Sequence, residues 1–221
     1  MTSSGLGAQD ITRPAGAPGA GGVRSATVER MKAKPTSDFD PDAAAQPGSG
    51  IFGLPHAPDA ARVVVIPVPV DATTSYRDGT ARAPQAVLAA SRQVDLWDRE
   101  YGAIHEGGIA MLPVPASLKR ANEQARRAAL PILRAGGARR GEARHARAIA
   151  SVDAMGDRVN AWVKEQARRA LDRGQLAVVL GGDHSSPFGL IDELADRHEG
   201  LGILHVDAHH DLREAYEGFH W

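Results

Sequence analysis

The stretch that decides the fold is QLAVVLGGDHS at residues 175–185, a short apolar run followed by a glycine-bearing polar loop. A second stretch, GILHVDAHHD at residues 202–211, repeats this order. The apolar runs at 175–180 and 202–206 predict buried strands of a parallel sheet. A helix predicted at 186–197 would join them in a right-handed crossover. Both polar motifs should then meet at the carboxyl edge of the sheet, where ligands bind in open α/β proteins.

The two motifs carry four side chains that can hold a metal ion: His184, Asp207, His209 and Asp211. Carboxylates and imidazoles without any thiolate form a hard to borderline ligand set, which suits manganese, zinc, nickel or iron rather than copper(I). The alternate positions 207, 209 and 211 would lie on one side of an extended chain, although a kinked loop could also bring them together. Asp207 is well placed to bridge two ions.

Two further histidines lie within the second motif. His205 falls inside the predicted strand, which favours a buried histidine behind the ligands over a ligand. His210 alternates with its neighbours and is expected to point away from them. The sequence therefore predicts a metal site that uses neither histidine directly.

The motifs LGGDHS at 180–185 and HVDAHHDLR at 205–213 together resemble the metal-binding signature of the ureohydrolases, the arginase and agmatinase family. Upstream, PVPVDATTSYRDGT at 67–80 and APQAV at 83–87 resemble the first strand, loop and helix of that family. The tail AYEGF at 215–219 resembles the agmatinase branch. The resemblance covers residues 63–221.

The resemblance implies two ions, with His184 and Asp211 on one, His209 on the other and Asp207 between them. It implies Mn²⁺, with Ni²⁺ left open, and hydrolysis of the guanidino group of a small substrate, agmatine or a related compound, with release of urea. Supporting positions behind the ligands are expected for Asp183, Ser185 and His205, and contributions to the rim of the substrate pocket for Arg213, Tyr216 and Glu217.

The resemblance also implies that part of the site lies elsewhere. The family's second carboxylate pair, in an S-x-D-x-D context, does not occur in this sequence, and the proton-shuttle histidine is expected beyond Trp221. We therefore expect residues 51–221 to form the N-terminal portion of a ureohydrolase α/β domain that is incomplete at its C-terminus. An alternative hypothesis is a truncated or split chain that is inactive alone and retains residual metal binding. A mononuclear zinc deacetylase of related architecture fits the motifs less well.

Composition restricts the function classes further. The chain has 221 residues, of which 43% are hydrophobic and 24% charged, and a net charge of -1, so nothing draws it to nucleic acid or an anionic membrane. The absence of cysteine excludes disulfides and thiolate sites and favours a cytoplasmic protein. We expect no membrane and no nucleic-acid partner, and a homo-oligomer if the domain is complete.

Residues 1–50 are rich in Gly, Ala, Pro and Ser, lack a sustained apolar period and are predicted to form a disordered tail. The apolar segments 62–70 and 107–112 predict two strands, with a short strand or extended segment at 94–97 and a helix at 85–91.

The stretch 118–147 is basic and helical, and we expect Pro131 and Gly136-Gly137 to interrupt it. A further amphipathic helix is predicted at 149–174, with a stripe of apolar side chains packed on the sheet. These elements predict a three-layer α/β/α architecture with a mainly parallel, arginase-like sheet. If strands are missing at the C-terminus, apolar faces should stay exposed and favour association.

Overall fold

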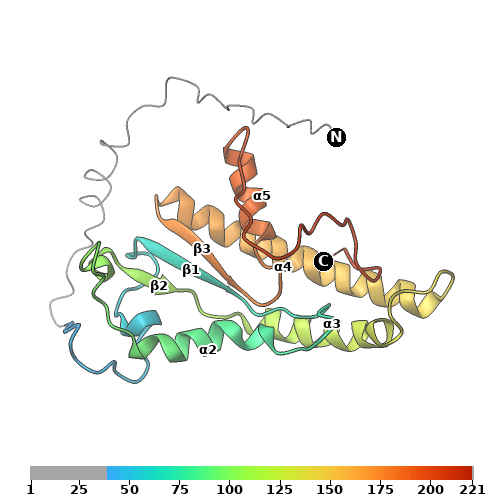
Figure 1. Ribbon diagram of the computed structural model, residues 1–221, viewed down its shortest axis with the longest axis horizontal. Helices are drawn as coiled ribbons and strands as arrows, with labels where there is room; N and C mark the ends of the chain where they lie inside the picture. Colours follow the sequence, from blue (N-terminus) through green and yellow to red (C-terminus); the bar gives the residue numbers. More distant parts are fainter. Residues whose placement is uncertain (1–38, 221) are drawn as a thin grey trace, which may run out of the picture.

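The computed structural model describes residues 39–220, and a parallel sheet lies at its centre (Figure 1). Within this range the sheet contains β1 (Val63–Val68), β2 (Ile109–Met111) and β3 (Leu176–Gly181), in the order β2-β1-β3. The register of β1 joins Val63 to Ile109 on one side and to Leu176 on the other. The strands predicted at 62–70, 107–112 and 175–180 are therefore confirmed, with shorter bounds for the first two.

β1 is the central strand because it is apolar on both faces. Val64, Ile66 and Val68 are buried on the face that packs on the long helices, and Val65 and Pro67 are buried on the other. Burial on both sides is typical of parallel strands and explains a run of Val and Ile without polar alternation.

Two long helices, α3 (Ala116–Arg134) and α4 (Ala143–Asp172), cover one face of the sheet (Figure 1). The predicted stripe of α4 packs in this core, with Val152, Val159, Val163 and Ala167 buried. The expected interruption at Pro131 is wrong, because α3 continues through it to Arg134 and the Pro131 carbonyl accepts a hydrogen bond from the Ala135 amide (3.2 Å). Burial of Ile132 at 0% exposure holds this last turn in place. The chain turns only at Gly136 and Gly137, both with positive φ.

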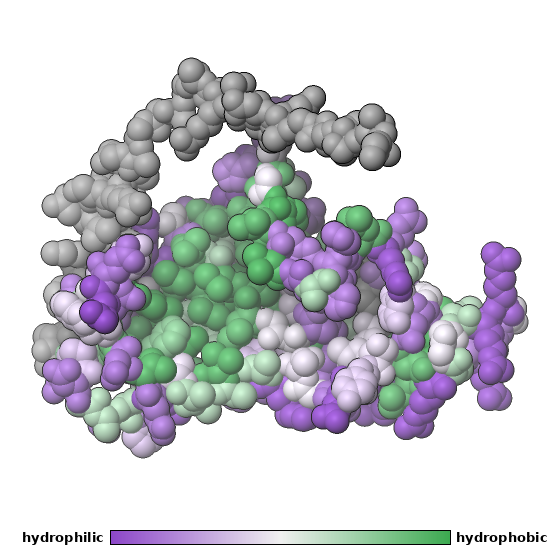
Figure 2. All heavy atoms as spheres, viewed as in Figure 1, coloured by the Kyte–Doolittle hydropathy of each residue, from purple (hydrophilic) through white to green (hydrophobic). Residues whose placement is uncertain are grey.

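The other face of the sheet is only partly covered. The helix α2 (Ala83–Ala90) contacts β3 and the short helix η1 (Ile51–Gly53), while η2 (Thr80–Arg82), η3 (Ser91–Gln93) and η4 (Ile104–Gly107) lie in the connecting segments. Figure 2 shows an extended apolar surface over the strands on the side viewed. The three-layer arrangement is thus present but incomplete, and the predicted exposure of apolar surface is found.

After β3 the chain forms α5 (Phe188–Arg197), which packs on α4, and then continues without regular structure. The strand predicted at 202–206 is wrong, since Ile203, Leu204 and Val206 are exposed and pair with no strand. A strand forms only where neighbouring backbone groups and cover are available, and the apolar character of this segment does not supply them. The segment 94–97 likewise lies outside the strands, with Trp97 exposed.

Residues 1–38 of the predicted tail lie outside the described residues. Within 39–50, the Ser49 carbonyl accepts a hydrogen bond from Arg92 (2.7 Å), and the ring of Phe39 lies 6.1 Å from that of His105. None of the helices between residues 39 and 220 combines the length and apolar character that crossing a bilayer requires.

Candidate metal centre

The loop after β3 is fixed against the end of β1. The amide of Gly182 donates to the Val68 carbonyl (3.2 Å), and the amide of Asp183 donates to the Val70 carbonyl (2.9 Å). A Cβ on Gly182 would lie 2.2 Å from the Val70 oxygen, so only glycine allows this approach. This close contact explains why glycine occupies position 182. It also fixes the backbone that carries Asp183 and His184.

His184 follows this fixed turn and meets two carboxylates from the segment after α5. Its Nε2 lies 3.1 Å from Asp211 Oδ2, and its Nδ1 lies 3.6 Å from Asp207 Oδ2. Ligand atoms of His184, His205, Asp207 and Asp211 all lie within 4.8 Å of one another, and we call these four residues the ligand cluster. The two motifs therefore converge although the crossover strand between them is not formed.

Asp207 faces different imidazoles with its two oxygens. Its Oδ2 is turned to His184 and His205, the latter at 3.9 Å, whereas its Oδ1 lies 3.2 Å from His209 Nδ1. The hydrogen bond from the His209 amide to Oδ1 (2.8 Å) holds the pKa of Asp207 below its usual value, and the nearby histidines lower it further. Asp207 therefore stays an anion that can be shared between two positive groups.

Asp207, His209 and Asp211 do not lie on one side of an extended chain. The segment bends at 207–209, and Asp211 has φ 48°, in the left-handed region. The bend brings Asp211 back to His184 and leaves the His209 side chain 81% exposed and outside the ligand cluster. The segment is therefore the kinked loop that was the alternative to an extended chain. His205, which the sequence did not favour as a ligand, lies in the ligand cluster.

Asp183 and Ser185 flank His184 and stabilise the turn that carries it. The Ser185 hydroxyl donates to Asp183 Oδ1 (2.6 Å), and the Ser185 amide donates to the same oxygen (3.2 Å). Burial raises the pKa of Asp183, and these hydrogen bonds offset only part of that effect. Both residues shape the loop that carries His184.

Residues expected at the substrate rim lie along the last described segment. The Arg213 guanidinium lies 5.0 Å from the centre of the Tyr216 ring. The Glu217 carbonyl accepts a hydrogen bond from the Ala138 amide (3.0 Å), and Phe219, at 3% exposure, anchors the segment in the core. The role of Arg213, Tyr216 and Glu217 towards a substrate stays a prediction.

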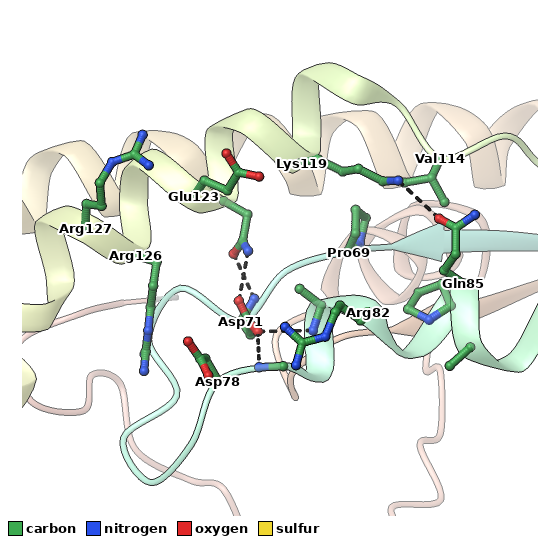
Figure 3. A pocket seen from close by; sticks show the side chains of 15 residues that line it. Pro69, Asp71, Asp78, Arg82, Gln85, Val114, Lys119, Glu123, Arg126 and Arg127 are labelled. Carbon is green, nitrogen blue, oxygen red and sulfur yellow. Dashed lines mark hydrogen bonds between the residues drawn. The ribbon is translucent and has the colours of Figure 1, made fainter.

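A second polar arrangement, which the sequence did not single out, lies at the end of β1 (Figure 3). The buried Asp71 accepts hydrogen bonds from Asn122 (2.8 Å) and from the amides of Gly79 (2.7 Å) and Ala81 (3.2 Å). Burial alone would raise the pKa of Asp71, but these donors bind the charged form and lower it below its usual value. The only sequence signal was an aspartate directly after an apolar strand.

Asp71 lies in the wall of an open groove of about 790 Å³ between the 78–86 segment and α3. Charged side chains of both signs line it, and Arg126 is held in place by a hydrogen bond to the Thr74 carbonyl (2.5 Å). Figure 3 shows Asp71 between α3 and the loop that carries Asp78 and Arg82, with hydrogen bonds that reach its carboxylate from both sides. Asp71 therefore fixes the loop between β1 and α2.

The ligand cluster fits a divalent metal by the chemistry of its donors. Two imidazoles and two carboxylates converge, and gathered carboxylates are costly unless a positive group lies among them. The donor types are those that manganese, zinc, nickel and iron accept. The cluster is also open to water, with the His184 side chain 60% and the Asp211 side chain 42% exposed, so it is not a closed structural site.

Most of the described chain is similar to known proteins. Residues 61–220 match the family model described as the arginase family. The chain is 32% identical over 171 residues to an N(1)-aminopropylagmatine ureohydrolase of Thermus thermophilus, covering 76% of this chain and 46% of the relative. It is 26% identical over 164 residues to an agmatinase of Bacillus anthracis (72% and 44% covered), and 27% identical over 167 residues to a proclavaminate amidinohydrolase of Streptomyces clavuligerus (75% and 43%). The chain thus spans less than half the length of these curated relatives.

Proposed function

Because the chain belongs to the arginase family, we propose that it provides the first ligands of a metal-dependent hydrolase that cleaves the guanidino group of a small substrate and releases urea. The observation that carries this proposal is the convergence of His184 with Asp207 and Asp211 from a separate segment. The names of the relatives support a guanidino substrate such as agmatine or an aminopropyl derivative of it. We propose this reaction and this substrate for the whole protein, in which these residues form part of the metal site.

The proposed ligands are His184, Asp207, His209 and Asp211, and the two faces of Asp207 support a division between two ions. His184 and Asp211 lie on the side of Oδ2, and His209 lies on the side of Oδ1. A carboxylate that offers one oxygen on each side could be shared by two ions. His205 lies 3.9 Å from both carboxylates, so it is suited to hold their orientation or to replace a ligand.

Bound divalent cations supply acidified water at neutral pH and a positive field for the charge that develops on the substrate. The chain's own residues would hold the ligands in position. The Gly182 turn fixes His184, the His209 amide keeps Asp207 ionised, and Ser185 holds Asp183. We propose Mn²⁺ as the metal, with Ni²⁺ as the alternative, and a cytoplasmic location, which the lack of cysteine favours.

The test is urea release from agmatine and N1-aminopropylagmatine by the purified chain after loading with Mn²⁺ or Ni²⁺, together with elemental analysis of the bound metal. Metal binding with little urea release supports a site whose other ligands come from outside the chain. Metal binding with fast urea release shows that the chain suffices for the reaction. A chain that binds neither metal and releases no urea contradicts the proposal.

A further inference from the structure

The turn at residues 71–74, which follows β1, lies beside the loop that carries His184. The Asp183 amide donates a hydrogen bond to the Val70 carbonyl (2.9 Å), directly before this turn. Thr73, within the turn, lines a small cavity together with Asp183. The turn therefore borders the residue that directly precedes His184, and a displacement of the turn would reach His184 through one peptide unit.

Arg126, on α3, binds this turn through three acceptors. Its Nη1 donates to the Ala72 carbonyl (3.3 Å) and to both the carbonyl (2.5 Å) and the Oγ1 (3.3 Å) of Thr74. The Thr74 hydroxyl in turn donates to the Asp71 carbonyl (3.0 Å) and closes the turn. Hydrogen bonds from a charged donor are stronger than those between neutral groups, so Arg126 holds the backbone at two positions of the turn.

The environment of Arg126 differs from that of its neighbour Arg127. Arg126 is half-buried, and its Nε is buried without a hydrogen-bond partner among the described residues. Arg127 is exposed, and Figure 3 shows Arg126 extending from α3 towards the loop after β1 while Arg127 points in a different direction. Partial burial of a charge costs free energy, which the bonds to the turn offset. The conformations of Arg126 and of the turn therefore depend on each other.

We propose that Arg126 is a positioning residue for His184. By holding the 71–74 turn, Arg126 sets the position of the loop after β3 and so the affinity of His184 for a metal ion. Without the guanidinium, the Thr74 carbonyl would lose its charged donor and the turn could move. The loop would follow because its Asp183 amide is bonded to the start of the turn. The part of this inference that concerns metal affinity rests on the proposed function.

Amide hydrogen exchange of the full chain, followed by mass spectrometry, tests the positioning without any metal. Arg126→Met keeps the apolar stem and removes the donors, so exchange in peptides that contain Asp183 should become several-fold faster, while exchange in β2 stays that of wild type. Arg127→Met is the matched control and should change neither. Ile132→Val weakens a buried contact of the same helix away from the turn and should not speed up exchange at Asp183 selectively.

The second measurement is the affinity for Mn²⁺ by isothermal titration calorimetry. Arg126→Met should lower it about three- to tenfold, less than the loss of about 10- to 100-fold that is typical when a direct support of a ligand is removed. Arg126→Lys keeps one donor for the Thr74 carbonyl and should recover most of this loss.

Unchanged exchange at Asp183 in Arg126→Met overturns the proposal, and so does an equal effect of Ile132→Val. An affinity of Arg126→Met equal to that of a manganese-binding wild type also overturns it. A wild type that binds no manganese contradicts the proposed function instead, and the exchange rates then decide by themselves whether Arg126 positions the loop.

Discussion

The Nε2 atom of His184 lies 3.1 Å from Asp211 Oδ2, although the two residues come from segments on either side of α5. The Gly182 turn fixes His184 against β1, whereas Asp211 reaches it through a left-handed bend of an exposed loop. One side of the proposed centre is therefore held by backbone hydrogen bonds to the end of β1, and the other lies on an exposed loop.

Replacing His184 should weaken metal binding on the Oδ2 side of Asp207. A His184→Ala variant loses the imidazole that faces both carboxylates, and we expect the affinity for Mn²⁺ to fall at least about tenfold. Isothermal titration calorimetry measures this change. His210→Ala is the control, since His210 is exposed and lies outside the ligand cluster. Equal affinities of the two variants would show that His184 is not a ligand.

His209 tests whether Asp207 serves two ions. His209→Ala removes the imidazole on the Oδ1 side and leaves His184 and Asp211 on the Oδ2 side. The amount of Mn²⁺ bound at saturation should fall, while binding by His184 and Asp211 remains. Equilibrium dialysis and elemental analysis measure this amount. A His205→Ala variant serves for comparison. If that variant, and not His209→Ala, lowers the amount bound, His205 is the ligand and His209 is not.

Gly182 should tolerate no side chain. In a Gly182→Ala variant the new Cβ would meet backbone atoms of Val68 and Val70 at 2.2–2.8 Å, and we expect a loss of about 1–3 kcal/mol in the free energy of unfolding. Gly202→Ala is the matched control, because nothing lies within 4 Å of its Cβ. Its change should stay within about 0.5 kcal/mol in the same urea titration. Equal stability of both variants would mean that the loop is not held against β1.

Asp71 should make the free energy of unfolding depend on pH in the acidic range. Its folded pKa lies below its usual value, so its contribution is present above about pH 4, the ordinary aspartate pKa, and is lost as pH falls through the folded pKa. Asp71→Asn should lower the free energy of unfolding by about 1.5–3 kcal/mol at pH 7, because the loop amides lose a charged acceptor. The variant should also lose less stability on acidification than wild type. Parallel acid profiles of the two proteins would contradict this role.

Much of the fold could be predicted from local pattern. The unbroken apolar run around Val64 and Ile66 needs burial on both faces, which makes it a central strand, and the spacing of Val152, Val159 and Val163 allows only a helix packed on one side. The segment 202–206 has the same apolar character but remains exposed. Strand formation depends on a neighbour supplied by the rest of the fold, and a local pattern does not contain that information.

The site shows the same division between local and tertiary information. Residue types and spacing identified His184, Asp207 and Asp211 as residues that converge. They place His205 inside a predicted strand and so favour His209, whereas the structure brings His205 into the ligand cluster and leaves His209 beside Asp207 Oδ1. Asp71 was missed, since its role rests on Asn122, which lies on α3 far along the chain. Contacts of this kind leave no periodic signal.

The most direct test of the central claim is manganese bound per chain, measured by elemental analysis after dialysis against micromolar Mn²⁺, for wild type and for Asp207→Ala. Asp207 faces His184 with one oxygen and His209 with the other, so its loss should remove binding on both sides. We predict bound manganese in the wild type and none above background in the variant. Equal manganese in the two proteins, or none in either, would contradict a metal centre at these residues.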